Sequence, residues 1–149
     1  MPEYALKNPY FKKGYIRTDK ILQEIKKGGN VSRSEFETAL DDYSKSLEEA
    51  EIIDAAANIL WLIFVLYSVL PDERSIKIGE VLSCFQSLRD SKEYTELGDY
   101  YLALRYITGM IDNDYEQLYN KDIGMKMMLS YLSLGNLYAF RFIEKAISI

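Results

Sequence analysis

Apolar residues recur at spacings of three and four along most of the chain, the period of helices with one buried face. This period predicts helices over about residues 19–27, 34–70, 73–90, 92–112 and 122–146, the last of them uninterrupted. No segment of useful length alternates apolar and polar residues as a half-buried strand does. The sequence therefore predicts an all-α fold, a single helical bundle of five or six helices that includes residues 1–149.

One segment, Ala55–Leu70, carries no charge and is apolar on every side. This is typical of a helix buried all round, so we expect a central helix at about 55–70 with Trp61 and Phe64 near its middle. The alternative is a membrane span, which needs about 20 apolar residues. The run has sixteen residues, includes Asn58, and has acidic residues at both ends. We therefore favour a central helix and expect no membrane contact.

The first thirty residues are predicted to hold an irregular segment followed by a short helix. Asn8-Pro9 and Gly14 interrupt the helical period, so residues 1–17 are expected to form an irregular arm rich in basic and aromatic residues. Thr18 is a suitable N-cap for the first helix, which Gly28-Gly29 would end.

The segment that follows leaves two points open. Either Ser32 or Ser34 can cap its helix, and Ser34 has Glu37 three residues later, the spacing of a capping box. The helical period then continues as far as Pro71. It fits either one helix of over thirty residues or two helices with a bend near 49–54.

The net charge of −5 is distributed unevenly. Residues 1–33 carry eight basic and three acidic residues, whereas 35–54 hold eight acidic residues and only Lys45 as a cation. Clustered cations bind phosphate backbones, and aromatic side chains stack on unpaired bases. The candidate nucleic-acid-binding residues are Lys7, Lys12, Lys13, Arg17, Lys26, Lys27 and Arg33. The alternatives are that these cations are merely solvated, and that the acidic segment is a solvated face or docks a basic partner.

Catalytic chemistry is hard to assemble from this composition. The chain has no histidine and one cysteine, which excludes Ser-His and Cys-His pairs and histidine-ligated metal sites. No phosphate-binding loop or nucleophile elbow occurs, and Cys84 lies among apolar residues, as a core thiol does. We expect no enzyme activity, no cofactor and no metal. The lack of an apolar N-terminal signal segment and of a disulfide pair favours a cytoplasmic location.

Two short segments resemble tetratricopeptide repeats. Tyr131–Tyr138 (YLSLGNLY) resembles the first helix of such a repeat, and Gly98–Ala103 (GDYYLA) resembles the second. The repeat period of about 34 residues is not kept between Gly98 and Gly135. The resemblance implies a helical protein-interaction module, and its alternative is that small residues permit close helix crossings.

The layout as a whole resembles the small helical subunits of CRISPR interference complexes, particularly type III. The similar features are the lead Asn8–Phe11, the capped helix start Val31–Phe36, the strongly apolar helix that follows, and the closing segment Tyr138–Ala146. The resemblance implies a non-catalytic subunit of a multi-protein assembly that contacts the backbone of RNA or single-stranded DNA. The acidic residues of 34–60 depart from the basic face expected along a bound strand. The alternative function is a protein–protein adaptor or homodimeric module that does not bind nucleic acid.

Overall fold

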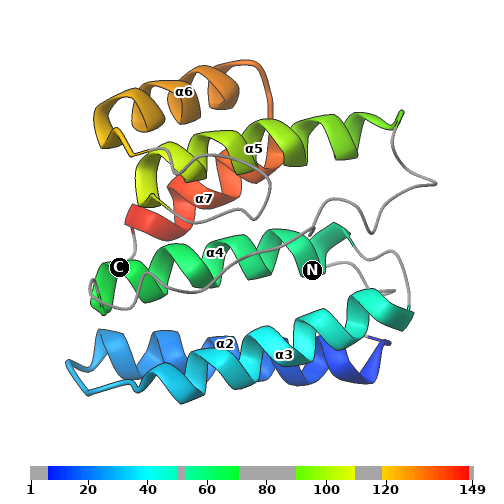
Figure 1. Cartoon of the computed structure of the whole chain (residues 1–149), viewed down its shortest axis with the longest axis vertical. Coiled ribbons are helices and arrows are strands. Elements are labelled where there is room, and N and C mark those ends of the chain that lie inside the picture. Colours follow the sequence, from blue (N-terminus) through cyan, green and yellow to red (C-terminus); the bar gives the residue numbers. More distant parts are fainter. Residues whose placement is uncertain (1–6, 50–52, 71–89, 110–118, 148–149) are drawn as a thin grey trace.

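Six helices make up the secondary structure of the described residues in the computed structural model of this chain (Figure 1). The structure describes residues 7–49, 53–70, 90–109 and 119–147. The helices are α2 (Pro9–Lys26), α3 (Arg33–Glu49), α4 (Ile53–Val69), α5 (Lys92–Thr108), α6 (Lys121–Ser133) and α7 (Leu137–Ile147). These residues contain no strand, so the predicted all-α bundle is confirmed. The helix expected over 73–90, with Cys84, lies almost wholly outside the described residues.

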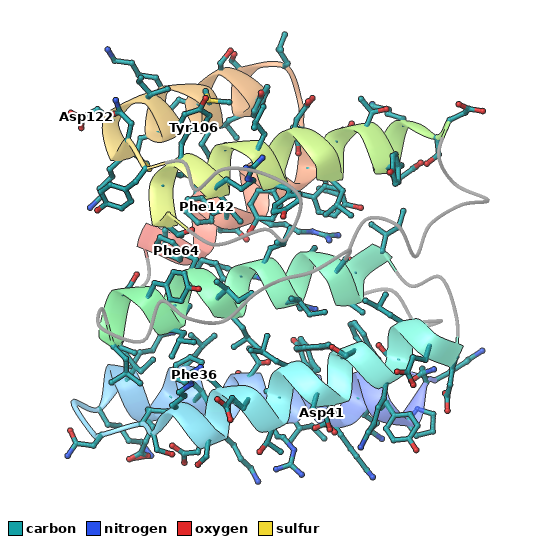
Figure 2. All side chains as sticks on the ribbon, in the orientation of Figure 1. Phe36, Asp41, Phe64, Tyr106, Asp122 and Phe142 are labelled. Carbon is teal, nitrogen blue, oxygen red and sulfur yellow. The ribbon has the colours of Figure 1, made fainter. Side chains whose placement is uncertain are left out.

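The central position expected for the apolar segment is confirmed by α4. The hairpin of α2 and α3 covers one side of α4, and α5 and α7 cover the other (Figure 1). Figure 2 shows Phe64 of α4 and Phe142 of α7 pointing toward each other, and their ring centroids are 4.8 Å apart. Trp61 is fully buried beside them, 5.8 Å from the Phe142 ring. Among the described residues, every helix falls short of the length and apolarity that a membrane crossing requires.

The expectation of an irregular arm is wrong from Pro9 onward, because α2 runs unbroken from Pro9 to Lys26. The Asn8 side chain caps it by accepting hydrogen bonds from the N–H groups of Tyr10 and Phe11, both at 3.1 Å. Proline is tolerated in a first turn, where its missing N–H would have no helical partner. Gly14 is required within the helix, since a Cβ there would lie 2.9 Å from the Tyr43 ring of α3.

Thr18 is likewise not an N-cap, because it lies in the middle of α2. Its hydroxyl donates to the carbonyl of Gly14 at 2.8 Å and lies 2.9 Å from the Tyr43 hydroxyl. The predicted end of this helix is confirmed, since Gly28 follows it with a φ of +76°, a conformation that glycine adopts without strain.

Of the two alternatives for the segment before Pro71, two helices are found: α3 ends at Glu49, and α4 begins at Ile53. The cap of α3 is Ser32, whose backbone N–H donates to a Glu35 carboxylate oxygen at 2.8 Å. Ser32 is therefore the N-cap, Glu35 supplies the carboxylate half of a capping box, and the Ser34 alternative is wrong.

The expectation of one uninterrupted last helix is also wrong. The chain turns between α6 and α7 at Gly135, whose φ is +84°. The N–H of Asn136 donates to the carbonyl of Tyr131, and the N–H of Gly135 to that of Leu132, both at 3.0 Å. These two bonds form a Schellman motif, which ends a helix. The Leu134-Gly135 pair that resembles a tetratricopeptide helix therefore lies in a turn.

Candidate binding surfaces and an interhelical groove

The seven cations predicted to bind nucleic acid do not share one surface. Lys12 and Lys13 are exposed on α2, and Lys7 and Lys27 are exposed just beyond its ends. The structure adds Lys20, which lies seven residues from both Lys13 and Lys27 and is exposed. We call Lys13, Lys20 and Lys27 the basic ridge, because residues seven apart share a helix face. At 1.5 Å per residue, the ridge is about 21 Å long.

The other three predicted cations have partners or another environment. Arg17 forms an ion pair with Asp42 at 2.8 Å, and Arg33 forms one with Glu37 at 2.7 Å. Lys26 lines a hollow between helices. Residues 7–49 together carry nine basic and eight acidic residues, so the hairpin that holds the basic ridge has a net charge close to zero.

The acidic residues of 35–54 do not form a single face either. Asp41 lies on the outward side of α3 (Figure 2) and pairs with Lys45 at 3.2 Å. Asp42 and Asp54 are buried, and the Asp54 carboxylate accepts a 2.8 Å hydrogen bond from Arg141 of α7. In the described part of the chain, no three His, Cys, Asp or Glu side chains are arranged to hold a metal ion.

Large apolar side chains are exposed where α6 meets α7. Leu134 is 80% exposed, Leu137 46% and Phe140 51%, all within seven residues. We call these three residues the apolar corner. Apolar residues exposed singly are ordinary on a protein surface, whereas a group of them marks an interaction site.

The apolar corner is held rigidly on α5. The Asn136 side chain caps α7 by accepting from the N–H groups of Tyr138 and Ala139 at 2.9 and 3.1 Å. Its amide also donates to the Glu96 carbonyl at 2.9 Å, and the Glu96 carboxylate accepts from the N–H of Leu137 at 3.1 Å. The exposed side chains therefore project from a fixed backbone, which lowers the entropy lost when a partner binds.

A groove runs along α4, with α2 and α7 as its walls. It consists of two adjoining hollows of about 220 and 230 Å³, which share Tyr15, Asn58, Trp61 and Lys145 as lining residues. The first hollow extends past the Asp54–Arg141 ion pair. Its remaining aromatic lining consists of Tyr100, Tyr138 and Phe142.

Two polar side chains of α4 beside this groove have no hydrogen-bond partner within the described residues. Asn58 is 6% exposed, lines both hollows, and makes no side-chain hydrogen bond within the described residues. The indole N–H of Trp61, itself 2% exposed, also has no hydrogen-bond partner there. The ammonium of Lys145 lies over the Trp61 ring, 5.4 Å from its centroid. Burial lowers the pKa of Lys145, and Arg141 lowers it further.

These groove residues were not predicted as a site, yet one signal was present. Asn58 is the one polar residue of the predicted core segment apart from Tyr67 and Ser68 near its end. Asp54, Asn58 and Trp61 are spaced by four and three residues, so they lie on the same face of α4. That α2 and α7 border this face depends on the tertiary fold, which the spacing does not show.

Comparison of the chain with protein-family models, curated proteins and solved structures gives no match. The basic ridge, the apolar corner and the groove therefore have to be interpreted from their own chemistry.

Proposed function

We propose that this chain is a non-catalytic binding subunit that associates with a second copy of itself through the apolar corner. The observation that carries the proposal is the exposure of Leu134, Leu137 and Phe140 on a backbone pinned to α5. Complete burial of such a side chain is worth about 1.5–3 kcal/mol. Six half-exposed residues, three from each copy, would contribute roughly 5–9 kcal/mol before the cost of association, which fits a weak dimer.

A second copy suits this surface because a two-fold axis brings the same patch of each chain together. Apolar residues then face apolar residues, and no complementary charge is required. Glu144 lies on the same exposed side of α7, one turn beyond Phe140. If the two α7 helices cross in opposite directions at Phe140, each Glu144 approaches the N-terminal end of the other α7. A carboxylate is stabilised there by the helix dipole.

The proposed dimer would leave the basic ridge accessible. In Figure 1, α6 and its corner with α7 lie at the upper end of the molecule, and the α2–α3 hairpin lies at the lower end. A dimer formed at the corner would therefore present one α2 on each outer side, which suits a subunit of a larger assembly.

Sedimentation velocity over a concentration series tests the association. We expect the wild-type chain to form a weak dimer with a dissociation constant on the order of 0.1–1 mM. Phe140→Ser and Leu134→Ser should each weaken it by tenfold or more, since each removes apolar area from the centre of the contact. Ile16→Ser is the matched control, because Ile16 is 45% exposed but lies on α2. Equal effects of Ile16→Ser and Phe140→Ser would refute the proposal.

A second candidate function, contact with a nucleic-acid backbone, is supported by the basic ridge. Three phosphate contacts on a single strand predict a salt slope of about −2, so that affinity falls roughly 18-fold between 50 and 200 mM salt. Fluorescence anisotropy with labelled single-stranded RNA and DNA measures this fall.

A matched pair of triple variants tests whether the basic ridge makes the contact. Charge reversal of the ridge (K13E, K20E and K27E) should abolish the binding. The control, K92E, K121E and K126E, changes the net charge equally on α5 and α6 and should weaken binding less. Equal losses in both triple variants, or no binding at low salt, would count against this candidate.

A further inference from the structure

Beside the groove between α2, α4 and α7, the Trp61 N–H is buried without a hydrogen-bond partner, and the Asn58 amide makes no hydrogen bond to the described residues. More than nine in ten buried polar groups in proteins have a hydrogen-bond partner, and each exception costs about 1–3 kcal/mol. Asn58 and Trp61 lie one turn apart on α4, and a leucine at position 58 would match the apolar residues around it. A nearly buried amide that lines a hollow without a protein partner, as Asn58 does, is expected where a ligand completes its hydrogen bonds.

The groups at the centre of the groove are mainly hydrogen-bond donors. The Lys145 ammonium only donates, and the Asn58 amide supplies two further N–H donors and one acceptor. The Trp61 N–H is buried too deeply for a ligand oxygen to reach it, so Trp61 contributes its ring to the lining. The other charged residues of the two hollows are the Asp54–Arg141 pair, Glu144, Asp19 and Lys26. The formal charges of these groups and Lys145 balance, so the specific feature at the centre is the donor set rather than the net charge.

The remaining lining is aromatic. Tyr100 and Tyr138 stack with centroids 6.2 Å apart, and Phe142 packs beside them. Tyr15 of α2 lines both hollows and is 40% exposed, so it lies at the mouth of the groove. A flat apolar group would be buried against these rings, while its polar head reached the donors on α4 and α7.

We infer that this groove binds a small organic anion, with a carboxylate or phosphate head on Asn58 and Lys145 and an aromatic body against Trp61 and the tyrosines. The oxygens of such a head accept hydrogen bonds from the Asn58 amide and the Lys145 ammonium. A charge-assisted bond from Lys145 is stronger than one between neutral groups. This inference is independent of the proposed dimer, because the apolar corner contributes no lining residue to either hollow.

Trp61 is the single tryptophan of the chain, so its fluorescence reports directly on the groove. The probes are benzoate and phenyl phosphate, which separate a carboxylate from a phosphate head, with benzyl alcohol as a neutral analogue of similar shape. We expect at least one anion to change the Trp61 emission saturably, with a dissociation constant below about 10 mM, and benzyl alcohol to bind at least tenfold more weakly. No saturable change with either anion, or equal binding of benzyl alcohol, would overturn the inference.

Two substitutions assign the binding to the named groups. Asn58→Leu and Lys145→Met should each weaken the anion at least tenfold, and circular dichroism confirms that each variant is folded. Lys121→Met removes an exposed lysine of α6 and is the control for Lys145→Met. Unchanged affinity in both groove variants would overturn the inference. Asn58→Leu should also raise the melting temperature, because it replaces an amide without a protein hydrogen bond by an apolar side chain on a buried helix.

Discussion

The crossing of α5 and α6 can be tested by adding a single methyl group. A Cβ on Gly124 of α6 would lie 2.6 Å from Cγ1 and 2.8 Å from the backbone nitrogen of Ile107, and 3.0 Å from the carbonyl oxygen of Ala103. Two of these atoms belong to the α5 backbone, so a side-chain rotation does not relieve the overlap. Overpacking of this kind costs about 1–3 kcal/mol, which exceeds the gain of about 0.5–1 kcal/mol from replacing a helical glycine by alanine.

Gly98 of α5 provides a matched control for Gly124→Ala. A Cβ on Gly98 would meet no atom within 4 Å, so Gly98→Ala should stabilise the protein by about 0.5–1 kcal/mol. The same substitution is therefore expected to have opposite signs at two sites. Taking a net cost of about 1–2 kcal/mol at Gly124, the free energies of unfolding should differ by roughly 2–3 kcal/mol, or about 4–12 °C in melting temperature.

Thermal and urea unfolding followed by circular dichroism measure both variants. The reasoning requires Gly124→Ala to be the less stable of the two. A Gly124→Ala variant as stable as Gly98→Ala would show that α5 and α6 do not approach as closely as the structure has them.

Three further predictions concern the core, the ion pair and the corner. Arg141→Met should cost about 2–4 kcal/mol in unfolding free energy, because it removes a 2.8 Å ion pair from buried Asp54; a double-mutant cycle with Asp54→Asn should give a coupling of about 1–3 kcal/mol. Burial raises the pKa of Tyr100 above its usual 10, so the free energy of unfolding should fall as the pH rises above 10. Above pH 10, the free energy of unfolding of Tyr100→Phe should fall by about 1.4 kcal/mol less per pH unit than that of the wild type, as measured by urea unfolding at alkaline pH. Asn136→Ala should cost about 1–2 kcal/mol and also weaken the dimer in sedimentation, since it removes the α7 cap and the bond to α5.

The fold class and the central helix could be predicted because both depend on local patterns. The apolar period of each helix lies within a few residues, and a run without charge requires burial wherever it lies. The start of α2 could not be predicted this way. Gly14 disfavours a helix locally, and the reason for its presence there is the Tyr43 ring, which arrives from α3. Tertiary packing overrode local propensity at this position.

The division between α6 and α7 was missed for a different reason. The apolar period continues on both sides of Gly135, and a helix interrupted for three residues keeps nearly the same pattern. The adjacent Gly135-Asn136 was the signal available, since glycine ends helices and asparagine begins them. The apolar period on both sides is the stronger local signal, and it indicates one continuous helix.

The candidate sites show where charge counting along a chain stops being informative. Eight cations among residues 1–33 predicted a common basic surface, but Arg17 and Arg33 pair with carboxylates of α3. The Arg33–Glu37 pair is an i,i+4 contact within α3, whereas the Arg17–Asp42 pair depends on the packing of α2 against α3, and a charge count includes neither. For the groove, the sequence does show the polar residue Asn58 within an apolar helix. Only the packing of α2 and α7 beside α4 shows that Asn58 lines a hollow.

The mass of the chain in solution, measured by multi-angle light scattering over a concentration series, tests the proposed self-association most directly. One chain has a mass of 17.3 kDa. The wild-type mass should rise with concentration toward twice that value, while Phe140→Ser should remain at the mass of one chain. A wild-type mass of one chain at every concentration up to about 2 mM, above the expected dissociation constant, would contradict association through the apolar corner.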